Sequence, residues 1–127
     1  MSAREPFEYA VVRVVPRVDR GESVNAGVIL YCQGRDFLGA RMALDHTRLR
    51  ALAPGSDVEE IERALALIPR VCAGGDDAGA IGALAPGERF RWLVAPRSTV
   101  VQPSPVHGGL CHDPALALEQ LLARLVL

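Results

Sequence analysis

The segment FEYAVVRVV, residues 7–15, is the most informative part of the sequence for the fold. It is rich in β-branched and aromatic side chains, which favour strands, and it is too short and too rich in valine for a helix. Pro16 follows it, and a proline cannot donate to a strand ladder. We therefore predict a strand over residues 7–15, at the centre of a sheet.

Two further strands are predicted after this one. A polar loop containing Asp19, Arg20 and Gly21 leads to VNAGVILYC at residues 24–32, which has the same strand-like composition. Gly34 and Asp36 then form a turn into a third strand over residues 37–44. Three antiparallel strands in a meander are the simplest arrangement of these segments.

A short helix and a long one are predicted next. Asp45 caps a short helical segment that Pro54 and Gly55 end, and Ser56 and Glu59 have the spacing of a capping box. An apolar series at helical period follows, formed by Val58, Ile61, Leu65, Ile68 and Cys72. This periodicity predicts a helix that packs one face on the sheet.

The last third of the chain reads less regularly. We predict a strand over residues 90–95 (FRWLVA), and mostly irregular backbone over residues 96–112, where three prolines and two adjacent glycines occur. Asp113 as N-cap and Pro114 at the first helical position begin a C-terminal helix. Its apolar stripe consists of Leu118, Leu121, Leu122, Leu125 and Val126.

Together these elements predict an α+β fold in one domain over residues 1–127. Its antiparallel sheet has about four to five strands, the N-terminal three-stranded meander plus residues 90–95, with the two main helices packed on one face. A chain of this length buries a sufficient core without disulfides or a structural metal.

Composition narrows the functional classes. The formal net charge is −1 and all 14 basic residues are arginines, which argues against a general nucleic-acid binder. A local contact with nucleic acid stays a weaker alternative; it would use Arg17, Arg20, Arg89, Arg91 and Arg97.

No apolar stretch approaches the roughly 20 residues that span a membrane, and no signal peptide is visible. Three separated cysteines indicate reduced thiols, so we expect a cytoplasmic protein without membrane contact.

Polar residues in the irregular segment are the first candidates for a site. Arg97, Ser98, Gln102, Ser104 and His107 would present donors at fixed directions to an anion such as phosphate or carboxylate. The alternative is that these side chains satisfy the backbone of a segment without secondary structure.

Three residues of the predicted strands are further candidates. Arg13 and Arg41 interrupt apolar strands, so each points to solvent or to a partner, and side by side they would form a basic spot. Asn25 lies near Gly27, where a ligand or another chain would approach closely, although a β-bulge is the commoner explanation.

The sequence contains no recognisable motif for a metal site, a catalytic nucleophile or a nucleotide cofactor. His107, Cys111 and His112 lack the second ligand pair that a structural zinc needs, and Ser98 or Ser104 with His107 has no nucleophile motif around it. Without any lysine there is no phosphate-binding P-loop, and no glycine-rich dinucleotide motif follows a strand. We expect neither a metal nor a cofactor.

Three segments carry a resemblance to a known family. They are residues 9–32 (YAVVRVVPRVDRGESVNAGVILYC), 48–54 (RLRALAP) and 88–110 (ERFRWLVAPRSTVVQPSPVHGGL). Together they resemble the domain of unknown function 3037 family of bacterial proteins. The resemblance implies a small accessory protein encoded beside HipA-like kinases, and it implies no established activity.

Two functional hypotheses follow. In the favoured one the chain is a non-enzymatic interaction protein, in which residues 96–112 and an exposed sheet edge bind a HipA-like kinase or a second copy. Arg97 with Trp92 or Phe90 would be the anchors, because interfaces favour arginine and aromatic residues. In the other, Arg97, Ser104 and His107 converge on a small anionic molecule, with His107 as the acid or base of a hydrolytic enzyme.

Overall fold

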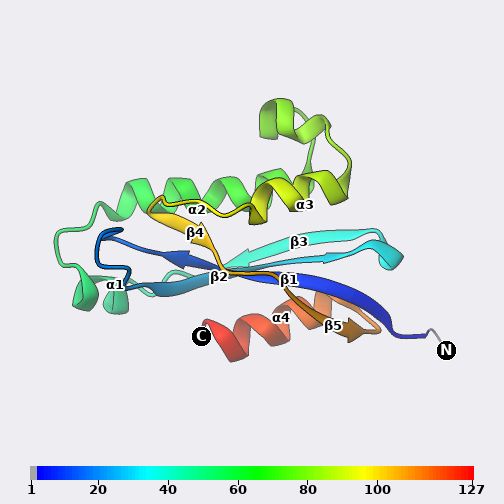
Figure 1. Cartoon of the computed structure of the whole chain (residues 1–127), viewed down its shortest axis with the longest axis horizontal. Coiled ribbons are helices and arrows are strands. Elements are labelled where there is room, and N and C mark those ends of the chain that lie inside the picture. Colours follow the sequence, from blue (N-terminus) through cyan, green and yellow to red (C-terminus); the bar gives the residue numbers. More distant parts are fainter. Residues whose placement is uncertain (1–2) are drawn as a thin grey trace.

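Five antiparallel strands form the centre of the computed structural model, which describes residues 3–127 (Figure 1). The strands are β1 (Glu5–Val14), β2 (Val24–Cys32), β3 (Phe37–Met42), β4 (Val101–Pro103) and β5 (His107–Cys111). The first three form the expected meander, with β2 between β1 and β3. The α+β class and the antiparallel sheet are thus confirmed.

The long strand β1 organises the sheet. One of its edges pairs with β2 along most of its length. The other edge pairs with two short strands in turn, with β4 opposite Val12 to Val14 and with β5 opposite Glu5 to Tyr9. Because hydrogen-bonded neighbours lie on both of its edges, β1 is the central strand that its apolar composition predicted.

Helices cover both faces of the sheet (Figure 1). On one face lie α2 (Val58–Ala73) and α3 (Pro86–Val94), and on the other lies α4 (Pro114–Leu125). Successive side chains of β2 alternate between two cores, since Ile29 packs in the α2 and α3 core whereas Val28 and Leu30 pack in the α4 core. Two helices therefore pack on one face, but they are α2 and α3. The C-terminal helix, which was expected beside α2, instead forms a third layer on the other face.

Short helices complete the chain. They are η1 (Gln33–Arg35), α1 (His46–Leu52) and η2 (Asp76–Ala83). The side chain of Asp45 accepts a hydrogen bond from the backbone of Arg48 and so begins α1 as expected. The helix α2 begins one residue later than predicted, because Asp57 rather than Ser56 accepts from the third backbone N–H, that of Glu60.

Residues 90–95 were predicted as a strand, and this prediction is wrong. Residues 86–94 form α3, with Pro86 in its first turn. Phe90, Leu93 and Val94 are its buried residues, at the spacing of one helix face. A short apolar run has no clear period of its own, so contact with α2 decides its conformation.

The irregular backbone expected over residues 96–112 is also corrected, because this segment contains β4 and β5. Pro103 lies at the edge of the sheet, where a proline is tolerated. Gly109 lies opposite Phe7, and a Cβ atom on this glycine would come 2.6 Å from the Phe7 ring. The glycine that suggested a loop is thus a strand residue that makes room for an aromatic ring.

Candidate binding cleft

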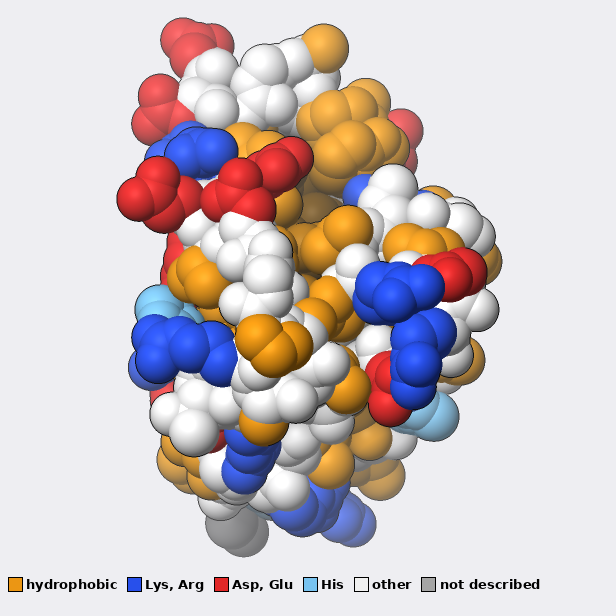
Figure 2. All heavy atoms as spheres, turned by 90° about the vertical axis from the view of Figure 1, so that its left-hand side faces the viewer, with side chains coloured by type: hydrophobic (Ala, Val, Ile, Leu, Met, Phe, Trp, Pro, Cys, Tyr) orange, Lys and Arg blue, Asp and Glu red, His pale blue; other side chains and the backbone are white. Residues whose placement is uncertain are grey.

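A cleft of about 660 Å³ lies between α2 and residues 97–103, which include β4. Figure 2 shows hydrophobic side chains inside a hollow, with acidic side chains gathered on one side of it. Apolar residues form most of its wall: Val12, Val18, Ile29, Ile61, Ala64, Leu67, Ile68, Val71, Trp92, Leu93, Val100 and Val101. A site of this size and lining suits an apolar group.

The rim of the cleft carries unusually exposed apolar side chains. Val18 and Trp92 are each 43% exposed, Leu67 is 52% exposed and Val100 is 38% exposed. All four line the cleft, which accounts for half of the large apolar side chains exposed over residues 3–127. Such a concentration around one hollow is typical of binding surfaces in general, whereas single exposed leucines need no explanation.

Arg97 and Trp92 form one end of the cleft. The guanidinium carbon of Arg97 lies 5.2 Å from the centre of the Trp92 ring. The same guanidinium donates from Nη2 to the Trp92 carbonyl at 2.7 Å and from Nε to the Ala95 carbonyl at 3.3 Å. Arg97 therefore satisfies carbonyls at the C-terminal end of α3 and fixes the orientation of the exposed indole ring.

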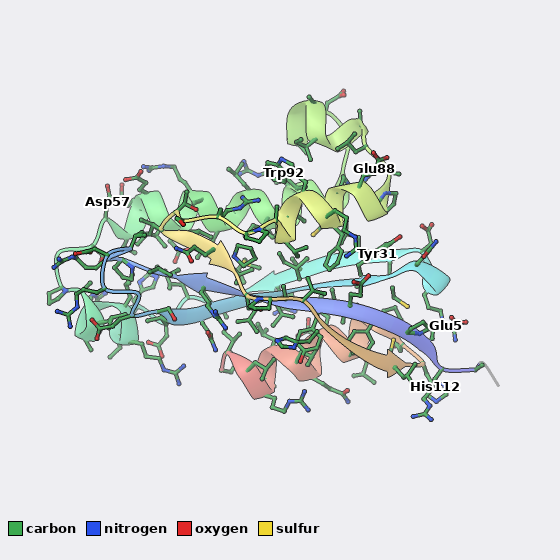
Figure 3. All side chains as sticks on the ribbon, viewed as in Figure 1. Glu5, Tyr31, Asp57, Glu88, Trp92 and His112 are labelled. Atoms are coloured by element: carbon green, nitrogen blue, oxygen red, sulfur yellow. The ribbon has the colours of Figure 1, made fainter. Side chains whose placement is uncertain are left out.

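Acidic groups from the start of α2 also line the cleft. Asp57 and Glu60 both belong to its wall, and the carboxylate of Asp57 accepts from the Glu60 backbone at 3.1 Å. Figure 3 shows Asp57 at the start of α2 and Trp92 farther along the same helical layer. The cleft thus carries carboxylates near the start of α2 and a guanidinium beside Trp92.

Four of the residues proposed from the sequence line this cleft, namely Trp92, Arg97, Ser98 and Gln102. Ser104 does not, because it is buried in the sheet. Its hydroxyl accepts from the Val11 backbone at 2.8 Å and donates to the Pro105 carbonyl at 2.9 Å, while its own N–H donates to Val11. Ser104 therefore has the structural role that we had considered as the alternative.

His107 lies elsewhere again, exposed on β5 and paired with Tyr9, whose ring centre is 5.5 Å away. The expected convergence of Arg97, Ser104 and His107 on one anion is therefore not formed. The physical reason is that β4 and β5 pair with different parts of β1, which separates residues that are close in the sequence.

Arg13, Asn25 and Arg41 belong to the face of the sheet that α4 covers. Asn25 donates to the Leu125 carbonyl at 3.0 Å, and Arg41 forms an ion pair with Glu119. Arg13 lies opposite Asn25 on one side and Gln102 on the other, whereas Arg41 lies opposite Val28, in another row. Arg13 and Arg41 do not lie side by side, so they form no shared basic spot.

The contribution of α2 to the cleft was missed from the sequence. Its wall residues Asp57, Glu60, Ala64, Leu67 and Val71 recur at intervals of three and four, which places them along one helix face. This second stripe lies beside the apolar series that was recognised. Leu67, an exposed leucine next to the buried face, was the available signal.

The cysteines and the candidate metal ligands lie outside the cleft. All three cysteines are buried, and burial raises the pKa of the Cys72 thiol to about 12. No group of three histidine, cysteine or acidic side chains is placed to hold a metal within residues 3–127. No helix in the same range is long and apolar enough to cross a bilayer.

A family model described as "Protein of unknown function (DUF3037)" matches residues 9–126. The chain belongs to this family. The resemblance seen in the sequence is confirmed, and the matched region includes every residue that lines the cleft of this DUF3037 protein. No curated protein and no solved structure matched the chain.

Proposed function

We propose that this DUF3037 protein is a non-enzymatic binding module that holds an apolar segment of a protein partner in the cleft between α2 and β4. The observation that carries this proposal is the cluster of four exposed apolar side chains, Val18, Leu67, Trp92 and Val100, around one hollow. Water around these side chains would be released when a partner covers them.

The charges at the cleft favour a particular kind of segment. Asp57 and Glu60 would attract a basic residue near the start of α2, and Arg97 would attract an acidic one beside Trp92. Such charges mainly set orientation and partner choice, whereas buried aromatic and aliphatic anchors provide most of the affinity. Trp92 and Leu67 are the anchors in this proposal.

The first partner to test is a HipA-like kinase of the bacterial cytoplasm, which the family resemblance implied. In this proposal the chain is an accessory protein, and the kinase supplies any chemistry.

The experiment compares two matched leucines. Leu67 on α2 is 52% exposed at the cleft, and Leu116 on α4 is 54% exposed and lies outside it. We expect Leu67→Asp to weaken binding to the kinase, measured by calorimetry, by at least about tenfold, because a carboxylate would be buried against apolar groups. Leu116→Asp should leave the affinity unchanged. Equal affinities for the wild type and Leu67→Asp would overturn the proposal.

A second candidate is a small apolar molecule with a carboxylate. The volume of the cleft falls in the range of small-molecule sites, and Arg97 provides a cation at its wall. Long-chain fatty acids of increasing length would then raise the melting temperature of the wild type, and Arg97→Gln would reduce this effect. Because Ser104 and His107 lie outside the cleft, this candidate involves binding without hydrolysis.

A further inference from the structure

The outer edge of β5 is the second notable surface of the molecule. β5 pairs with β1 on one side, and within residues 3–127 no strand pairs with its other side. An unpaired edge presents backbone donors and acceptors, which proteins usually protect or use for association.

The register of the sheet identifies which groups of β5 point outward. The N–H of Val11 donates to the Ser104 hydroxyl, and its C=O accepts from the Ser104 N–H, so both groups point to the β4 side. The N–H of Val15 points the same way and donates to the Val100 carbonyl. The N–H and C=O groups of successive residues in a strand point to opposite edges. Those of Phe7 and Tyr9 therefore point to the same edge of β1 as those of Val11, the edge that pairs with β5. Their partners Gly109 and His107 therefore bond inward to β1. The N–H and C=O groups of Gly108 and Leu110 consequently point outward.

Exposed apolar side chains lie at this edge, on either side of an open space above Gly108. Leu110 is 57% exposed and Val106 is 37% exposed. Leu110 lies on the same sheet face as Gly108, because side chains alternate along a strand, and Val106 immediately precedes β5. A Cβ atom on Gly108 would meet only the Phe7 carbonyl, at 3.6 Å, so the space above this glycine is open.

We propose that two copies of this chain pair antiparallel along their β5 edges, around a two-fold axis at Gly109. Gly108 of each copy would lie opposite Leu110 of the other, and each of these two pairs would exchange two backbone hydrogen bonds. Each Leu110 would fill the space over the opposing Gly108, beside Val106 of that copy. The two sheets would then join into one.

This register is self-complementary in charge as well as in shape. His107 would face Cys111 of the other copy, and Asp113 would face Pro105. No carboxylate or guanidinium would face its own kind, which is what a symmetric interface requires. The cleft lies between α2 and β4, outside this edge, so the dimer does not depend on the proposed partner.

Sedimentation equilibrium of the full chain tests the proposal. We expect a dimer whose dissociation constant rises at least tenfold in Leu110→Asp, because the new carboxylate would be buried against the other copy. Gly108→Pro should act in the same way, since it removes an outward N–H and leaves the inward bonds of β5 intact. Leu116→Asp, at a similarly exposed leucine outside this edge, and Leu67→Asp, in the cleft, should both remain dimeric.

Amide hydrogen exchange adds a readout of the register. The N–H groups of Gly108 and Leu110 should be protected in the wild type and exchange fast in Leu110→Asp, whereas those of His107 and Gly109 should stay protected in both. Circular dichroism verifies that each variant folds, and if Gly108→Pro does not fold, Leu110→Asp alone decides. A wild type that is monomeric at the concentrations used for NMR, or a dimer that Leu110→Asp does not weaken, would overturn the proposal.

Discussion

Ser104 illustrates how one side chain can replace part of a strand ladder. It is 3% exposed, and its hydroxyl is the acceptor for the buried N–H of Val11. We expect Ser104→Ala to lower the free energy of unfolding by about 1–3 kcal/mol, because a buried donor loses its partner. Urea denaturation measures this loss. The exposed Ser98→Ala should stay within about 0.5 kcal/mol of the wild type, and similar losses in both variants would contradict the role assigned to Ser104.

The buried thiol of Cys72 should make the free energy of unfolding depend on pH. Burial raises the pKa of its thiol from 9.0 to about 12 in the folded state. Below pH 9 both states hold the proton, and above it only the unfolded chain releases it. The free energy of unfolding should therefore fall as pH rises from 9.0 toward 12, by up to about 1.4 kcal/mol per pH unit from this group.

Urea denaturation over this pH range, on the wild type and Cys72→Ala, isolates the effect of the thiol. The variant loses packing at every pH, so only the two slopes are compared. We expect a shallower slope for Cys72→Ala, and equal slopes would show that this thiol ionises as readily in the folded state as in the unfolded one.

At the scale of elements, the start of α4 depends on one carboxylate. Asp113 accepts from the backbone of Ala115 at 3.0 Å and of Leu116 at 3.3 Å. We expect Asp113→Ala to destabilise the protein by about 0.5–2 kcal/mol, since two N–H groups lose their acceptor. Asp113→Asn should retain most of the stability in the same urea titration. If the asparagine variant were as unstable as the alanine one, the charge rather than the cap would be responsible.

The contrast between α3 and α4 shows which elements can be predicted locally. Asp113 and Pro114 begin α4 by their own chemistry, and this helix was expected at its observed position. In α3 the corresponding signals are Pro86 and Glu88, which lie ahead of residues 90–95. The carboxylate of Glu88 accepts from the Ala85 backbone at 3.4 Å. Residues 90–95 contain neither signal, and a short apolar run of this kind fits a strand as well as a helix.

For the whole molecule, the sheet couples two helical layers. Adjacent residues of β2 pack in different cores, so loss of one layer removes support from the strands that carry the other. We expect Leu121→Ala, in the α4 core, to cost about 2–5 kcal/mol, because it leaves a cavity. Trp92 fluorescence, from the opposite layer, should follow the same transition as circular dichroism. A helical transition that precedes the Trp92 transition would indicate separate unfolding of α4.

The meander, the caps of α1 and α4 and the apolar face of α2 could be predicted from local sequence, because strand composition, turn residues and helical period act over a few neighbouring residues. It also placed Trp92, Arg97, Ser98 and Gln102 among the candidate residues, which the cleft brings together. Contacts between distant residues were needed to continue α3 through residues 90–94, to pair β4 and β5 with β1, and to place α4 on the second face. These features depend on contacts between residues far apart in the chain, and so does the separation of Ser104 and His107 from Arg97.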